Sequence, residues 1–240
     1  MSRFLLIFLI AMLAAPVARA YNFEVTESEW TSWPPYCKAR YATVRVGKTS
    51  EYGRRVSTAE IEQWHATMGD GAWYGLHHFC AGLAYADRAK METKSDKREF
   101  NSKRALTEYG YMLRNTPTTD RMYAEVLTRV GLVHRNDGDL GAAQRYFAQA
   151  IENNPTYPGG YLAQYQVLHD RGSATQARDV LIKADEATRG QSSEVKYFLG
   201  MVSLDLGDVE AATTYAREAY LLGYPLPALR NRLAKSGVSL

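Results

Sequence analysis

The sequence predicts an all-α fold in which helical hairpins stack side by side as a solenoid. Three stretches repeat one spacing of apolar residues. The positions are Gly131, Ala143, Phe147 and Ala150, then Tyr165, Ala177, Leu181 and Ala184, then Gly200, Ala212, Ala216 and Ala219. Successive copies begin 34 and then 35 residues apart. This interval is typical of units that bury their apolar faces only against their neighbours.

The three repeats span 121–225, and each is predicted to be a helix, a tight turn and a return helix. In the first copy, apolar residues at helical spacing predict helices over Tyr123–His134 and Leu140–Glu152. Gly138 suits the turn between them because glycine readily adopts positive φ, and Pro155 ends the unit. Gly172 and Gly207 stand at the equivalent turns of the next two copies, which supports the register.

A fourth hairpin with a longer arm is predicted over 75–120. Gly82 is followed by Ala105, Tyr109 and Met112, which repeat the return-helix pattern after 11 additional residues. Such an insertion adds about three helical turns, shared between the two arms. The inserted stretch, Lys90–Phe100, is highly charged, so the tip of this hairpin is expected to project into solvent.

The tip carries more cations than anions. From residue 88 to residue 104 the cations are Arg88, Lys90, Lys94, Lys97, Arg98, Lys103 and Arg104. The anions are Glu92, Asp96 and Glu99. A solvated helix tip accounts for this composition, and weak contact with anionic surfaces is the alternative.

Both ends of the solenoid are predicted to be covered. Residues 21–74 hold all four tryptophans, Trp30, Trp33, Trp64 and Trp73, in an irregular segment with one helix over Thr58–Thr67 that Ser57 and Glu60 cap. We interpret this module as an N-terminal cap, and binding of cell-wall glycan by the tryptophans is the alternative. Residues 226–240 hold a capping helix and a tail, because Leu229 and Leu233 share one face.

The first 20 residues predict an export signal. Arg3 precedes an apolar run over Phe4–Val17, and Ala18-Arg19-Ala20 is the small-x-small pattern cleaved by signal peptidase. A retained anchor is the alternative, but the run is short for a bilayer span. We therefore expect cleavage after Ala20, a periplasmic or secreted protein, and no stable membrane span after removal of the signal.

Composition and cysteine count limit the kinds of protein that this chain can be. The chain is 46% hydrophobic and 23% charged, which is typical of a folded protein, and its net charge of +3 gives no reason to expect nucleic acid as a partner. Its two cysteines, Cys37 and Cys80, are predicted to form a disulfide in an oxidising compartment. Two separate buried thiols are the alternative.

At this point the repeats resemble the tetratricopeptide repeat family, through Gly131, Gly138, Ala143, Phe147 and Pro155. The resemblance implies a solenoid that binds proteins or peptides, with no enzymatic activity and no cofactor. The copies depart from the family pattern in three places. Tyr165 replaces a glycine, Arg189 stands where a proline is expected, and Tyr224-Pro225 shifts that signal by one residue.

The family's first helices line a concave groove, which implies a set of partner-binding residues here. They are Glu125, Thr128, Leu132, Arg135, Leu162, Gln166, His169, Glu194, Tyr197 and Met201. The corresponding face of the first hairpin, with Leu76 and Phe79, is too apolar to remain in water. We therefore expect Trp33–Tyr36 or a partner to cover it.

A metal or redox site is the main alternative to this binding role. His77 and Cys80 share a helix face and could join Cys37 in a three-ligand site, but no paired metal-binding motif accompanies them. Nucleophile and phosphate-loop motifs are also missing from the sequence. The leading prediction is a non-enzymatic scaffold of the bacterial envelope with an envelope protein or peptide as partner.

Overall fold

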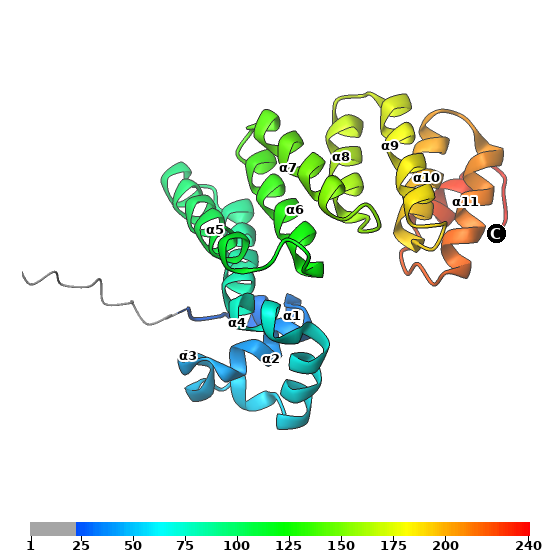
Figure 1. The fold of residues 1–240 in the computed structure, drawn as a ribbon. Helices are drawn as coiled ribbons and strands as arrows, with labels where there is room; N and C mark the ends of the chain where they lie inside the picture. Colours follow the sequence, from blue (N-terminus) through cyan, green and yellow to red (C-terminus); the bar gives the residue numbers. More distant parts are fainter. Residues whose placement is uncertain (1–22) are drawn as a thin grey trace, which may run out of the picture.

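The computed structural model describes residues 23–240, and this part of the chain is built of helices without strands. The predicted export signal lies outside the described residues. The helices are α1 Glu27–Ser32, α2 Pro35–Thr43, α3 Arg45–Thr49, η1 Gly53–Arg55, α4 Thr58–Met91, α5 Ser95–Asn115, α6 Arg121–Asn136, α7 Leu140–Asn153, α8 Gly159–Asp170, α9 Ala174–Ala187, α10 Ser193–Asp205, α11 Val209–Leu221 and α12 Ala228–Lys235. From α4 onward they pack as successive antiparallel pairs along an arc, with α1–α3 gathered near α4 (Figure 1).

The N-terminal module is more regular than the sequence suggested. Three short helices and a 3-10 turn replace the predicted irregular lead-in. Thr26 and Glu29 form a capping box that starts α1, and Pro35 occupies the first turn of α2, where its missing N–H costs nothing. Local capping residues therefore start helices in a segment whose composition predicted irregular structure.

Helix α4 passes through the predicted boundary at residues 74 and 75. Ser57 and Glu60 form the expected capping box at its start. At Gly69 the backbone leaves helical geometry, with φ 75° and ψ 158°, and then resumes the helix. The end predicted for the helix Thr58–Thr67 is therefore a break at Gly69 between two helical segments of α4. The second half resumes because Ala72 and Leu76 are fully buried against the core.

Close contact between glycine and a large side chain joins the two helices of a hairpin. A Cβ on Gly131 would lie 2.4 Å from the Phe147 ring, and a Cβ on Gly82 would lie 2.4 Å from the Tyr109 ring. The same interlock in α4–α5 and α6–α7 confirms the displaced copy in the first hairpin. In the last repeat, Leu229 of α12 fills the space over Gly200. Leu229 and Leu233 are fully buried, so α12 covers the end of this repeat.

Turn geometry follows the sequence expectation at Gly138, Gly172 and Gly207, whose φ values are 85°, 74° and 78°. The divergent turn after α9 differs. Arg189 adopts φ 54° and Gly190 follows with φ 68°, so two left-handed residues end this repeat instead of a proline.

The N-terminal module covers the apolar face of the first hairpin, as predicted. Leu76 and Phe79 are fully buried in one cluster that also contains Trp33, with Tyr36 packed against it. The rings of Tyr36 and Phe79 lie 6.4 Å apart. Between residues 23 and 240, no helix is long and apolar enough to cross a membrane.

The glycine interlock predicts opposite effects for two glycine-to-alanine substitutions. Gly131→Ala places a methyl group against the buried Phe147 ring and is expected to lower the free energy of unfolding by about 1–3 kcal/mol. In Gly110→Ala the new methyl meets only the mobile end of Arg114, at 3.1 Å, so the gain in helix propensity should stabilise by up to about 1 kcal/mol. Urea unfolding followed by circular dichroism measures both, and equal effects would contradict the interlock.

Candidate functional site

Charged and polar side chains link the first helices of successive repeats. Arg135 at the end of α6 donates to Gln166 Oε1 at 2.9 Å and to Asp170 Oδ2 at 2.6 Å, both on α8. The fork geometry of the guanidinium suits two acceptors at once. One arginine thus fixes the relative position of two repeats.

The same arrangement continues toward the C-terminus. His169 Nε2 lies 2.9 Å from Asp205 Oδ2 on α10, and Arg232 of α12 donates to Asp205 Oδ1 at 2.8 Å. Burial by itself would raise the pKa of Asp205, but the hydrogen bonds from Arg232 and His169 outweigh it and hold that pKa below its ordinary value. We call this surface, made by Arg135, Gln166, His169, Asp170, Asp205 and Arg232, the ladder face.

Aromatic rings pack next to residues of the ladder face. Tyr165, which replaces the expected glycine, lies 5.5 Å from His169 and 5.2 Å from Phe198 between ring centroids. Tyr197 stacks on Tyr224 at 4.1 Å. The departure at Tyr165 therefore provides an aromatic contact between two repeats.

The structure divides the predicted groove residues into two groups. Thr128, Leu162 and Tyr197 are 4%, 8% and 4% exposed, so they pack beneath the surface and are not available as contacts. The remaining residues are at least partly accessible. They are Glu125, Leu132, Arg135, Gln166, His169, Glu194 and Met201. Burial thus removes three of the expected contacts, of which Leu162 packs with Val195 and Leu199 of the next repeat.

Sequence reasoning missed Asp170, Asp205 and Arg232, which complete the ladder. Arg135 and Asp170 are 35 residues apart and His169 and Asp205 are 36 apart, close to the repeat interval. A search for opposite charges one repeat apart would have found these pairs. Arg232 lies outside the repeats, and no such spacing marks it.

Arg129 lies near carboxylates from three helices. It donates to Glu125 at 3.2 Å on α6, and its Nε is buried without a hydrogen-bond partner in the part of the chain described. Burial raises the pKa of Asp87 on α4 and of Glu194 on α10, and the positive charge of Arg129 opposes the rise at both. Arg129 is thus the central cation of the surface between the first helices.

A hollow lies where the N-terminal module meets the repeats. It has a volume of about 510 Å³. Its lining includes Pro35, Tyr36, Trp64, Tyr157 and Pro158, with Arg121, Glu125 and Asn154 among the polar members. We call it the junction groove.

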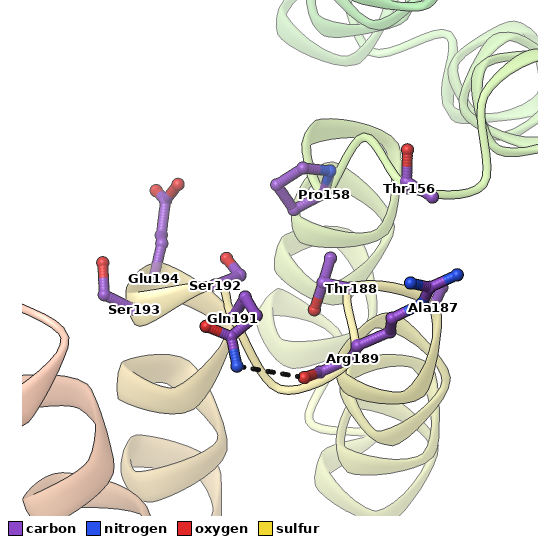
Figure 2. A pocket seen from close by; sticks show the side chains of 9 residues that line it. All are labelled: Thr156, Pro158, Ala187, Thr188, Arg189, Gln191, Ser192, Ser193 and Glu194. Atoms are coloured by element: carbon purple, nitrogen blue, oxygen red, sulfur yellow. Dashed lines mark hydrogen bonds between the residues drawn. The ribbon is translucent and has the colours of Figure 1, made fainter.

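An adjoining hollow of about 710 Å³ lies between the start of α8 and the loop that joins α9 to α10. Figure 2 shows Thr156 and Pro158 on one side and Gln191 to Glu194 on the other. Thr156 and Pro158 line both hollows, which are therefore adjacent.

The predicted disulfide is present and joins the module to the first hairpin. Cys37 of α2 and Cys80 of α4 are bonded and essentially fully buried. Both thiols are used, so neither offers a thiolate to a metal. Within residues 23–240, no group of three histidine, cysteine or acidic side chains is placed to hold a metal ion.

The histidines beside the disulfide take part in packing contacts. Arg40 Nη2 lies 3.1 Å from His77 Nδ1, and His78 Nδ1 lies 2.6 Å from Glu108 Oε2. His78 also stacks on Tyr111, with ring centroids 3.7 Å apart. Burial, the neighbouring His78 and the positive charge of Arg40 lower the pKa of His77 to about 3, so His77 is neutral at physiological pH.

Three of the four tryptophans are core residues. Trp30, Trp33 and Trp73 are 4–6% exposed and pack within the first cluster. Trp64 is partly exposed and lines the junction groove. The aromatic richness of the module therefore serves chiefly to seal the solenoid end.

Three cations of the basic segment 88–104 form ion pairs. Arg88 pairs with Glu29, Lys103 with Glu99, and Arg104 with Glu108. The hydrophobic side chains Met91 and Phe100 are exposed near it. Contact of this tip with an anionic surface stays a prediction.

Comparison with known families gives one match. Residues 124–157, which cover most of α6, all of α7 and the following loop, match the family model described as tetratricopeptide repeat. No curated protein matches the chain.

The low pKa of His77 predicts a loss of stability in mild acid. Since the unfolded chain binds a proton near pH 6.5 and the folded chain only near pH 3, the contribution of His77 is complete above pH 6.5 and declines as pH falls toward 3. His77→Gln should reduce the decrease in melting temperature between pH 7 and pH 5. Thermal melts of both proteins at each pH measure this, and parallel curves would refute it.

The disulfide is expected to contribute about 4 kcal/mol to stability on the chain-entropy model for a separation of 43 residues. Urea unfolding with and without reductant measures this contribution. On reduction, the unfolding midpoint followed by tryptophan fluorescence should shift to lower urea more than the midpoint followed by circular dichroism. The reason is that every tryptophan lies in the N-terminal module. A Cys37→Ala, Cys80→Ala double variant that still responds to reductant would show that the change has another cause.

Proposed function

We propose that this chain, which is a tetratricopeptide-repeat protein, is a non-enzymatic scaffold that binds a protein or peptide along its ladder face. The premise rests on the match over residues 124–157 and on the succession of packed helical pairs. Such repeats suggest an interaction module, and the face formed by their first helices supplies the surface proposed here.

The observation that carries the proposal is the fixed polar surface across repeats. Arg135, Asp170, His169, Asp205 and Arg232 hold one another at 2.6–2.9 Å. Side chains already ordered in the free protein lose little conformational entropy when a partner binds. The half-buried apolar residues Leu132 and Met201 can add apolar contact.

We further propose that the scaffold acts in the bacterial envelope, in the periplasm or outside the cell. The buried disulfide between Cys37 and Cys80 is compatible with an oxidising compartment. The predicted signal over residues 1–20 supports the same compartment. The partner would then be another envelope protein or an exposed segment of one.

Replacing the two apolar residues proposed to bind the partner together with the ladder face tests the function. A Leu132→Gln, Met201→Gln double variant keeps side-chain size but removes apolar surface, so capture of the partner should fall by about tenfold or more. In-cell crosslinking followed by mass spectrometry measures the captured protein.

Ile182→Gln is the matched control, because Ile182 is an exposed apolar residue of α9, outside the ladder face. Circular dichroism establishes that each variant is folded. Undiminished capture by a folded Leu132→Gln, Met201→Gln variant would reject the ladder face as the binding surface.

A further inference from the structure

The junction groove has walls of aromatic rings and prolines. Tyr36 and Trp64 pack edge to face with ring centroids 5.9 Å apart, and Tyr157, Pro35 and Pro158 complete this apolar surface. Aromatic rings offer flat surfaces on which a further ring can lie at little entropic cost. The groove therefore suits a ligand that carries rigid apolar rings.

The polar atoms of the groove are mainly hydrogen-bond donors. Within the described part of the chain, neither Tyr36 nor Tyr157 uses its hydroxyl in a hydrogen bond. Burial, with the nearby charge of Glu125, raises the pKa of both hydroxyls, which therefore keep their protons. The indole N–H of Trp64 adds a third donor.

Two side chains of the groove already accept hydrogen bonds. Asn154 Oδ1 accepts hydrogen bonds from the amide and the hydroxyl of Thr156, at 3.1 Å and 2.8 Å, so its amide NH₂ remains as a donor. Glu125 accepts from Arg129 at 3.2 Å. A ligand that supplies acceptors therefore matches the donors of the groove.

The charges of the groove balance. The junction groove is lined by one cation, Arg121, and one anion, Glu125, and the adjoining hollow by Arg189 and Glu194. An acidic or a basic peptide would meet as much repulsion as attraction. Charge complementarity therefore favours an uncharged ligand.

We propose that the junction groove binds an uncharged, proline-rich peptide segment in the polyproline II conformation. Proline has no backbone N–H, so such a segment presents carbonyl acceptors to the donors of the groove and pyrrolidine rings to its aromatic walls. Its backbone is already extended, so little conformational entropy is lost on binding.

This proposal deepens the proposed function and rests on it, because the segment would belong to the protein partner. The groove continues through Thr156 and Pro158 into the hollow of Figure 2. A segment leaving the aromatic walls can thus pass over the loop between α9 and α10.

A direct binding titration tests the proposal. A dye-labelled polyproline peptide of about ten residues, long enough for several turns of the helix, is titrated with the purified protein and followed by fluorescence anisotropy. A glycine–serine peptide of the same length is the comparison. The protein should bind the polyproline peptide and show no saturable binding of the glycine–serine peptide.

Three variants locate the site. Trp64→Ala should weaken binding by about tenfold or more, and Tyr157→Phe, which keeps the ring and removes one donor, should weaken it several-fold. Tyr74→Ala is the matched control, because Tyr74 lies on α4 with 70% exposure and outside the groove, and it should bind as the unaltered protein does. Tyr157→Phe keeps the test valid should Trp64→Ala fail to fold.

The proposal is overturned if polyproline does not bind, or if Tyr157→Phe and a folded Trp64→Ala both bind it with unchanged affinity. Saturable binding of a chitin oligosaccharide, lost in Trp64→Ala, with no binding of polyproline would also overturn it in favour of glycan. Partner capture through the ladder face without polyproline binding would refute this peptide class and leave the proposed function standing. Polyproline binding with undiminished capture by the Leu132→Gln, Met201→Gln variant would reject the ladder face alone.

Discussion

The structure depends on the close approach of two helices where one of them lacks a side chain. A large ring fills the space over Gly131 and over Gly82, and Leu229 fills the space over Gly200. This contact sets how the two helices of a hairpin cross, and each hairpin then presents its remaining apolar face to the next. The arc of Figure 1 results from repetition of this unit.

In the second repeat, where Tyr165 replaces the glycine, the contact between helices is made by aromatic rings. Tyr165 contacts Phe198 of the next repeat, so an aromatic pair joins these two repeats. Tyr165 lies on the same helix as His169, with the two ring centroids 5.5 Å apart. The packing that compensates for divergent repeats therefore also holds the polar residues of the ladder face in place.

The two ends of the solenoid are closed differently. At the C-terminus a single helix, α12, buries Leu229 and Leu233 completely. At the N-terminus a disulfide-linked module covers Leu76 and Phe79 and also reaches the loop before α8. The junction groove exists because this module extends beyond the hairpin that it seals.

The sequence by itself determined the repeat, its register and the end caps, because the spacing of Gly131, Ala143 and Phe147 reflects contacts within one hairpin. It also indicated the pairing of Cys37 with Cys80, since two cysteines leave one possible disulfide. Tertiary structure alone decided which predicted groove residues remain accessible, because the burial of Leu162 and Tyr197 depends on residues of other helices that pack against them. It likewise decided that Arg232 joins the ladder and that Tyr36, Trp64 and Tyr157 meet, because contacts between distant segments have no fixed spacing in the chain.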